Sequence, residues 1–172
     1  MPGYVQVYTG EGKGKTTAAL GLALRAAGAG WNVFFAQFCK GMPTSELAAL
    51  EERLADRITV RQFGLPRFIM GQPGEEDAAL ARRGLEEARQ AVAKAKYRLV
   101  VLDEVNVAVK LQLFSIDDLL ALIDAKHPDV ELVLTGRDAH TRLVERADLV
   151  TEMLMVKHYF QQGVAARRGI EK

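Results

Sequence analysis

The stretch YTGEGKGKTT, residues 8–17, determines the predicted fold of this chain. It follows a strand-like run at residues 4–8 and leads into the helix-forming run AALGLAL at residues 18–24. A strand, a glycine-rich turn, Gly-Lys-Thr and a helix, in this order, make a P-loop. Glycines let several backbone N–H groups converge on one anion, and the start of the helix adds unpaired donors and the positive end of its dipole. The stretch therefore predicts a phosphate-binding loop.

Two side chains of this loop suit a magnesium nucleotide. We expect Lys15 to reach the phosphate chain as a point charge and the Thr16 hydroxyl to be a ligand of Mg²⁺. Thr9 stands where the usual pattern has a glycine, so the cradle should have altered geometry. The alternative is a glycine-rich turn that only connects strand to helix. The predicted nucleotide-binding residues of the loop are Thr9, Gly10, Glu11, Gly12, Lys13, Gly14, Lys15, Thr16 and Thr17.

The composition is that of one globular domain covering residues 1–172. Its 23 basic and 22 acidic residues nearly cancel, which gives no electrostatic reason to expect nucleic acid or a membrane as the partner. No run approaches the roughly 20 apolar residues of a transmembrane helix, and the N-terminus lacks a signal-peptide pattern. The single cysteine, Cys39, excludes an intrachain disulfide, so we expect a cytoplasmic protein.

Apolar runs alternate with runs of helical period along the whole chain. This alternation is typical of an α/β fold, with a mainly parallel sheet of about six strands and helices on both faces. We expect strands at residues 4–8, 31–38, 58–62, 98–103, 131–135 and 149–155. We expect helices from the P-loop to about residue 27 and at residues 45–55, 74–96, 115–125 and 141–146. Residues 63–73 form an apolar loop, which suggests a lid or a ligand wall, or else a loop folded onto the core.

A second group of polar residues is expected at the edge of the sheet where the P-loop lies. The apolar run LVVLDE, residues 99–104, ends in the carboxylates of Asp103 and Glu104. An acid at this place in a P-loop protein meets Mg²⁺ directly or through water, although either carboxylate alone could also be a helix N-cap. Arg137 follows the strand at 131–135 and could contact phosphate as a planar fork, or be a solvated loop arginine. Together these motifs predict a magnesium–nucleotide site without naming its reaction.

The residues resemble those of one family, the P-loop-type ATP:corrinoid adenosyltransferases, also called cob(I)yrinic acid a,c-diamide adenosyltransferases. The threonine at the first position of the P-loop is itself a trait of that family. The matching blocks are spread over nearly the whole chain. They are TGEGKGKTT at 9–17, QFCKG at 37–41, VVLDE at 100–104, TGR at 135–137, ADLVTEM at 147–153, VKH at 156–158, GV at 163–164 and GI at 169–170.

The resemblance implies an enzyme that moves the 5′-deoxyadenosyl group of ATP to Co(I) of a corrinoid. Cobalt attacks the ribose 5′ carbon and tripolyphosphate leaves whole, so the protein positions the substrates and stabilises the leaving group. It further implies a homodimer and a reduced flavoprotein as electron donor. The implied roles are Lys13 and Lys15 for the departing charge, Arg25 and Arg137 for nucleotide contacts, and Thr16, Asp103 and Glu104 for Mg²⁺.

The apolar loop is where the resemblance places the corrinoid. Phe68, Ile69 and Met70 are the predicted corrinoid-binding residues, and Phe68 is expected to displace the lower ligand of cobalt. Well-known members have a Phe-Thr-Trp stretch in this loop and an N-terminal extension over the corrinoid, whereas this loop reads RFIM and the first strand is expected from about residue 4. Two other function classes stay open: a small-molecule kinase or NTPase, and a non-catalytic, nucleotide-dependent corrinoid carrier.

Overall fold

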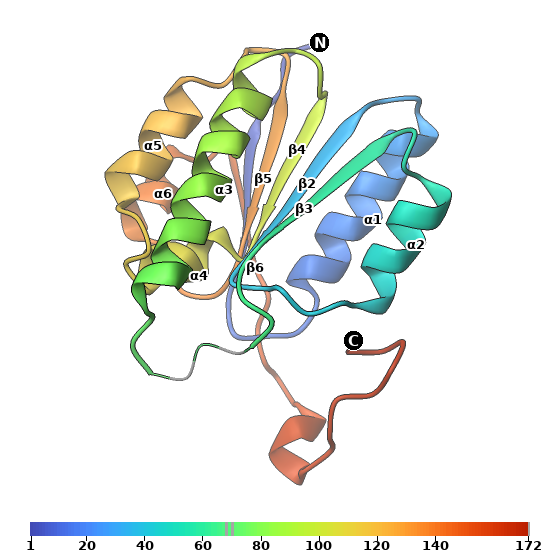
Figure 1. The fold of residues 1–172 in the computed structure, drawn as a ribbon, viewed down its shortest axis with the longest axis vertical. Helices are drawn as coiled ribbons and strands as arrows, with labels where there is room; N and C mark the ends of the chain where they lie inside the picture. Colours follow the sequence, from blue (N-terminus) through green and yellow to red (C-terminus); the bar gives the residue numbers. More distant parts are fainter. Residues whose placement is uncertain (68, 70, 172) are drawn as a thin grey trace.

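A computed structural model describes residues 1–67, 69 and 71–171 of the chain (Figure 1). Its six strands form one sheet in the order β3-β2-β4-β5-β1-β6, and every neighbouring pair is parallel. The strands are β1 (Val5–Thr9), β2 (Val33–Phe38), β3 (Ile58–Phe63), β4 (Leu99–Asp103), β5 (Glu131–Thr135) and β6 (Leu149–Glu152). The helices are α1 (Lys15–Gly28), α2 (Ser45–Arg53), α3 (Glu75–Ala93), α4 (Val105–Lys110), α5 (Ile116–Asp124) and α6 (Thr141–Arg146), followed by the 3₁₀ turn η1 (Tyr159–Gln162). The predicted α/β fold is confirmed.

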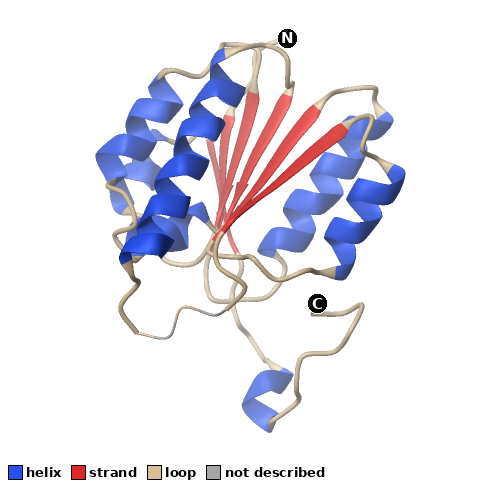
Figure 2. Cartoon of the chain, viewed as in Figure 1, coloured by secondary structure: helices blue, strands red, loops and turns tan. Residues whose placement is uncertain are grey.

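Helices cover both faces of the sheet (Figure 2). Helices α3, α4, α5 and α6 lie on one face, and α1 and α2 lie on the other. Successive strand residues point to opposite faces, so Phe34 and Phe38 join the core under α3 and α5, whereas Val33 and Phe35 join the core under α1 and α2. Burial on both sides explains why β2 and β4 are almost continuously apolar in sequence.

Helix α4 was not expected from the sequence, because its residues VNVAVK are rich in valine, which favours strands. The helix forms because Glu104 adopts a left-handed conformation (φ 60°) that turns the chain directly after β4. Val105, Asn106 and Ala108 are then buried against the sheet. Tertiary packing overrides the local preference of this segment.

Strand β6 is shorter than the predicted 149–155, since the ladder ends at Glu152. Residues beyond it leave the sheet and cross over the P-loop, and the tail that follows returns to the same edge (Figure 1). No helix in the described ranges has both the length and the hydropathy that crossing a bilayer requires.

The strand register brings the polar strand ends together at one edge. Gln37 of β2 pairs with Asp103 of β4, and Tyr8 of β1 pairs with Thr135 of β5. Because β5 lies between β1 and β4, Thr135 stands between the P-loop and the acid pair. Ligands of open α/β sheets bind at such a carboxyl edge.

Candidate active site

A cavity of about 960 Å³ lies at the carboxyl edge of the sheet. Its volume falls within the range of sites that bind small molecules. Segments from several parts of the chain form its wall: the P-loop, the loop after β2, the start of α2, helix α4, the loop after β5 and the C-terminal tail. The predicted site residues that line it are Gly12, Lys13, Gly14, Lys15, Thr16, Thr17, Ile69, Glu104 and Arg137.

The P-loop glycines are needed for packing as well as for an anion. Gly10 has a φ of 91°, and a Cβ on it would lie 2.5 Å from the carbonyl oxygen of Met153. A Cβ on Gly12 would lie 2.7 Å from the carbonyl oxygen of Leu154, and the Gly12 N–H donates to Met153 O at 2.6 Å. The backbone after β6 therefore passes so close to the loop that only glycine fits.

Gly12→Ala is expected to destabilise the protein by about 1–3 kcal/mol, because the added methyl group meets backbone that cannot move aside. Gly21→Ala is the matched control, since Gly21 lies inside α1 and a Cβ added to it would have nothing within 4 Å. Alanine should stabilise the helix there by about 0.5–1 kcal/mol. Urea unfolding of both variants measures the two changes, and two changes of the same sign would contradict this account of the loop.

Lys15 is held inside the loop that precedes it. Its Nζ donates to the carbonyl oxygens of Gly10 at 2.5 Å and Gly12 at 2.8 Å, and the residue is only 7% exposed. Burial lowers the pKa of Lys15, which the neighbouring Glu104 opposes. The loop thus fixes an ammonium group in the cavity wall, as the prediction for the phosphate chain requires.

Asp103 is entirely buried and accepts four hydrogen bonds. Its Oδ1 accepts from the hydroxyls of Thr16 at 2.9 Å and Thr135 at 2.7 Å. Its Oδ2 accepts from Gln37 Nε2 at 3.1 Å and Lys40 Nζ at 2.9 Å. These four donors use the acceptor capacity of an ionised carboxylate. Asp103 therefore orients the Thr16 hydroxyl, whose proton points at the carboxylate and whose oxygen accepts from the Lys40 ammonium at 3.4 Å.

Glu104 has a different environment from its neighbour. Its backbone N–H donates to the Thr135 hydroxyl at 3.0 Å. Its left-handed conformation turns the side chain into the cavity wall. Such a conformation is costly for a residue other than glycine. Among the described residues, its carboxylate makes only an ion pair with Lys40 at 3.8 Å. Burial raises the pKa of Glu104, and Lys40 works against that rise. Glu104 retains acceptor capacity on the cavity side, which Asp103 lacks.

Lys40 is the main residue that the sequence reasoning left without a role. It lines the cavity, and its ammonium lies beside both carboxylates and the Thr16 hydroxyl. Burial lowers its pKa, but Asp103 and Glu104 outweigh that effect and raise it above the usual value. Its place two residues after the end of β2 was the available signal, since polar residues that follow parallel strands meet at one edge.

The two predicted arginines lie in different places. Arg137 lines the cavity, where its Nε pairs with Glu11 at 3.4 Å, and Asn106 Nδ2 holds the adjoining loop through the Gly136 carbonyl at 3.0 Å. Arg25 lies in the exposed last turn of α1 and does not line the cavity. At 1.5 Å per residue, it is about 15 Å along the helix from Lys15.

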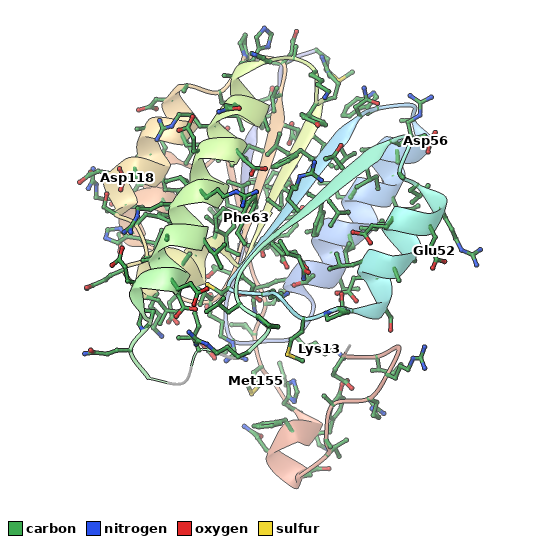
Figure 3. The ribbon with its side chains drawn as sticks, in the orientation of Figure 1. Lys13, Glu52, Asp56, Phe63, Asp118 and Met155 are labelled. Carbon is green, nitrogen blue, oxygen red and sulfur yellow. The ribbon has the colours of Figure 1, made fainter. Side chains whose placement is uncertain are left out.

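Lys13 faces the C-terminal tail that follows β6. Its Nζ contacts Glu171 at 2.7 Å, the Tyr159 hydroxyl at 2.9 Å and the Ile170 carbonyl at 3.1 Å. Figure 3 places Lys13 between the strand ends and this tail. Gly169, Ile170 and Glu171 also line the cavity. The tail is thus a wall of the site. Thr9 does not line the cavity, and its hydroxyl accepts the Ala139 N–H at 3.2 Å.

The apolar loop reaches the same cavity. Ile69 lines the cavity and also packs against the core under α3. For this residue, the loop is both a ligand wall and a segment folded onto the core. The loop is tied to α3 by Arg67, which pairs with the buried Asp77 at 2.7 Å. The predicted corrinoid residues Phe68 and Met70 lie outside the described residues.

Within the part of the chain that the structure describes, no three His, Cys, Asp or Glu side chains gather into a metal site. A nucleotide-bound Mg²⁺ does not need such a cage, because it takes one or two protein oxygens and completes its shell with phosphate and water. The Thr16 hydroxyl and the Glu104 carboxylate are hard oxygen donors of this kind, and the cavity wall contains both.

Comparison with known proteins shows the family of the chain. The family described as "ATP:corrinoid adenosyltransferase BtuR/CobO/CobP" matches residues 1–171. A corrinoid adenosyltransferase of Pseudomonas aeruginosa is 37% identical over 169 residues, which cover 98% of this chain and 83% of that protein. One from Sinorhizobium is 34% identical over 98% of this chain and 80% of its own length, and one from Escherichia coli K12 is 34% identical over 98% and 85%. The P-loop, the acid pair and the tail all fall within the matched range, and the chain belongs to the ATP:corrinoid adenosyltransferase family.

Proposed function

We propose that this protein transfers the 5′-deoxyadenosyl group of ATP to Co(I) of a corrinoid and releases tripolyphosphate. ATP-dependent adenosylation of corrinoids is the activity of the family to which the chain belongs. The observation that carries the residue assignments is the convergence of Lys15, Thr16, Glu104 and Ile69 on one cavity. That cavity combines a cationic phosphate end with an apolar wall. Family membership favours adenosyl transfer over the kinase and carrier alternatives.

The chemistry needs no protein nucleophile. The electron pair of Co(I) forms the cobalt–carbon bond while the bond between C5′ and O5′ breaks, and tripolyphosphate leaves with the electrons of that bond. The protein must therefore hold cobalt in line with C5′ and stabilise charge that grows on the leaving group. Lys15 and the amides of residues 10–14 supply that stabilisation in this proposal, apart from the Gly12 amide, whose N–H donates to Met153 O.

We propose that Thr16 and Glu104 hold Mg²⁺ and that Asp103 acts indirectly. The support is that Asp103 is buried and also accepts from Thr16, Gln37 and Thr135, whereas Glu104 lines the cavity and makes one long ion pair. When bound, Mg²⁺ would supply positive charge beside the departing phosphates. Asp103 would keep the Thr16 hydroxyl turned toward the cation.

The function is tested by incubating the protein with ATP, Mg²⁺ and chemically reduced cobalamin. We expect the spectrum of adenosylcobalamin to appear together with one tripolyphosphate for each cobalt alkylated. ADP with a phosphorylated acceptor would instead support a kinase. Tight binding of both substrates without any product would support a carrier.

Phe68→Ala is expected to spare ATP binding and turnover when Co(I) is supplied ready-made. It should depress turnover when the enzyme starts from Co(II) with a mild reductant, because an apolar side chain under the corrin excludes the axial ligand that resists reduction. The neighbouring residue in the sequence, Ile69, lines the cavity, which supports the assignment. The two assays are compared, and the Co(II) spectrum is recorded with ATP bound. Equal losses in both assays would assign Phe68 to the core or to general binding.

Three further assignments complete the proposal. We place the single domain of residues 1–172 in the cytoplasm, where ATP is available and Cys39 stays reduced. A reduced flavoprotein would supply the electron for Co(II).

The protein would act as a homodimer. The support is a group of exposed apolar residues on and after the edge strand β6: Leu149, Val150 and Leu154. Light scattering of the purified protein tests the dimer directly.

A further inference from the structure

The backbone around Lys40 is fixed by close packing between two loops. Lys40 follows Cys39, whose left-handed conformation (φ 57°) turns the chain at the end of β2. A Cβ on Gly41 would lie 2.2 Å from the Gly64 carbonyl oxygen, and a Cβ on Gly64 would lie 2.4 Å from the Lys40 nitrogen. The loops after β2 and β3 therefore interlock, and the Lys40 side chain starts from a defined point beside the acid pair.

The ammonium of Lys40 lies among the oxygens proposed to serve the metal. Its Nζ is 2.9 Å from Asp103 Oδ2, 3.4 Å from Thr16 Oγ1 and 3.8 Å from Glu104 Oε1. The Thr16 hydroxyl and the Glu104 carboxylate are the hard-oxygen ligands proposed for the cation, and Asp103 adds a buried negative charge beside them. In this structure, the cation at that position is a lysine side chain.

Only one of the partners of Asp103 is suited to leave. Gln37 and Thr135 are completely buried, and Thr16 is fixed at the start of α1. The Lys40 side chain is 31% exposed and sits on a flexible stem that reaches the cavity. A divalent cation entering between Thr16 and Glu104 would meet this ammonium first and would repel it.

We propose that Lys40 is a built-in counter-ion that occupies the cation position in the nucleotide-free protein and exchanges with Mg²⁺ when the metal arrives with ATP. The inference rests on the proposed magnesium site and adds a positioning role for a residue of this chain. It predicts that the ammonium weakens metal binding to the empty protein, so that metal and nucleotide enter together. The displaced ammonium would then face the phosphates, to which a lysine binds as a point charge.

The test is a titration of the nucleotide-free protein with Mn²⁺, which substitutes for Mg²⁺ and is counted as free ion by electron paramagnetic resonance. Lys40→Met should bind Mn²⁺ about ten-fold more tightly than the unmodified protein, because it removes a charge within 4 Å of the proposed ligands. Lys110→Met is the matched control. Lys110 lines the same cavity but pairs with Asp138 at 2.6 Å, so its loss should leave Mn²⁺ affinity nearly unchanged.

Thermal unfolding gives a second readout that does not depend on activity. Without metal, Lys40→Met should unfold at a lower temperature than the unmodified protein, because two neighbouring carboxylates lose their counter-ion. Added Mn²⁺ should raise the unfolding temperature of Lys40→Met more than that of the unmodified protein. Lys40→Gln, which keeps a polar group at the site, is the second variant should methionine prevent folding. Equal or weaker Mn²⁺ binding by the variants would overturn the proposal. If Lys40→Met binds Mn²⁺ more tightly but the unmodified protein forms no adenosylcobalamin, the counter-ion role is supported and the proposed reaction is contradicted.

Discussion

Lys15→Ala is expected to lower kcat/KM about 10²–10³-fold, because a preorganised contact to the leaving group is worth about 2.7–4 kcal/mol. The structure supports a large effect, since Lys15 is held by the Gly10 and Gly12 carbonyl oxygens and is nearly buried. An exposed lysine would move with solvent and stabilise the departing charge far less. Steady-state rates with ready-made Co(I) measure the effect without any contribution from the reduction of Co(II).

Two controls make the Lys15 result specific. Lys110→Ala removes the same charge from the same cavity wall at an exposed position, and its effect should be far smaller. Thermal unfolding of Lys15→Ala checks that the loop still folds without the two carbonyl contacts. If Lys15→Ala keeps kcat/KM within a few-fold of the original while remaining folded, the phosphate cradle is wrongly assigned.

Asp103→Asn is expected to cost about 3–5 kcal/mol of the free energy of unfolding, as the loss of one member of a buried charged network does. The N–H₂ group of the new asparagine would face Gln37 Nε2 and Lys40 Nζ, which are themselves donors and now donate to Asp103 Oδ2. Lys40 would also lose its nearest partner. The measurement is urea unfolding without metal or nucleotide, so that substrate binding does not contribute. Activity should fall as well, because the Thr16 hydroxyl loses the group that orients it.

Glu104→Gln is the matched control for Asp103, since it makes the same isosteric change one residue away. Glu104 makes one long ion pair, so its substitution should change stability by about 1 kcal/mol or less. It should raise the Mg²⁺ concentration needed for half-maximal rate, which the proposed ligand role requires. Equal destabilisation by the two variants would contradict the division of roles between the carboxylates.

The sequence by itself determined the fold class and the two central motifs. The P-loop is a local pattern, since TGEGKGKTT specifies a turn, a helix start and a lysine within nine residues. The strands were predicted to within a few residues, because doubly buried strands are continuous apolar runs that end at polar residues. Asp103 and Glu104 stood out for the same reason, and the parallel order of strands implied that they lie near the loop.

Only the tertiary structure decided which partner each of these groups has. Lys40 bonds to an aspartate 63 positions away and Lys13 to a glutamate 158 positions away, and no local pattern encodes either pair. The Lys40 contact exists because the strand register sets the end of β2, at Gln37, beside Asp103. The Lys13 contact exists because the tail returns to the P-loop. The strand order also puts β5 between β1 and β4. Local spacing fixes which groups stand at the end of each strand. The order and register of the strands fix which of those groups come within a hydrogen bond of one another, and that gave Asp103 four donors while leaving Glu104 facing the cavity.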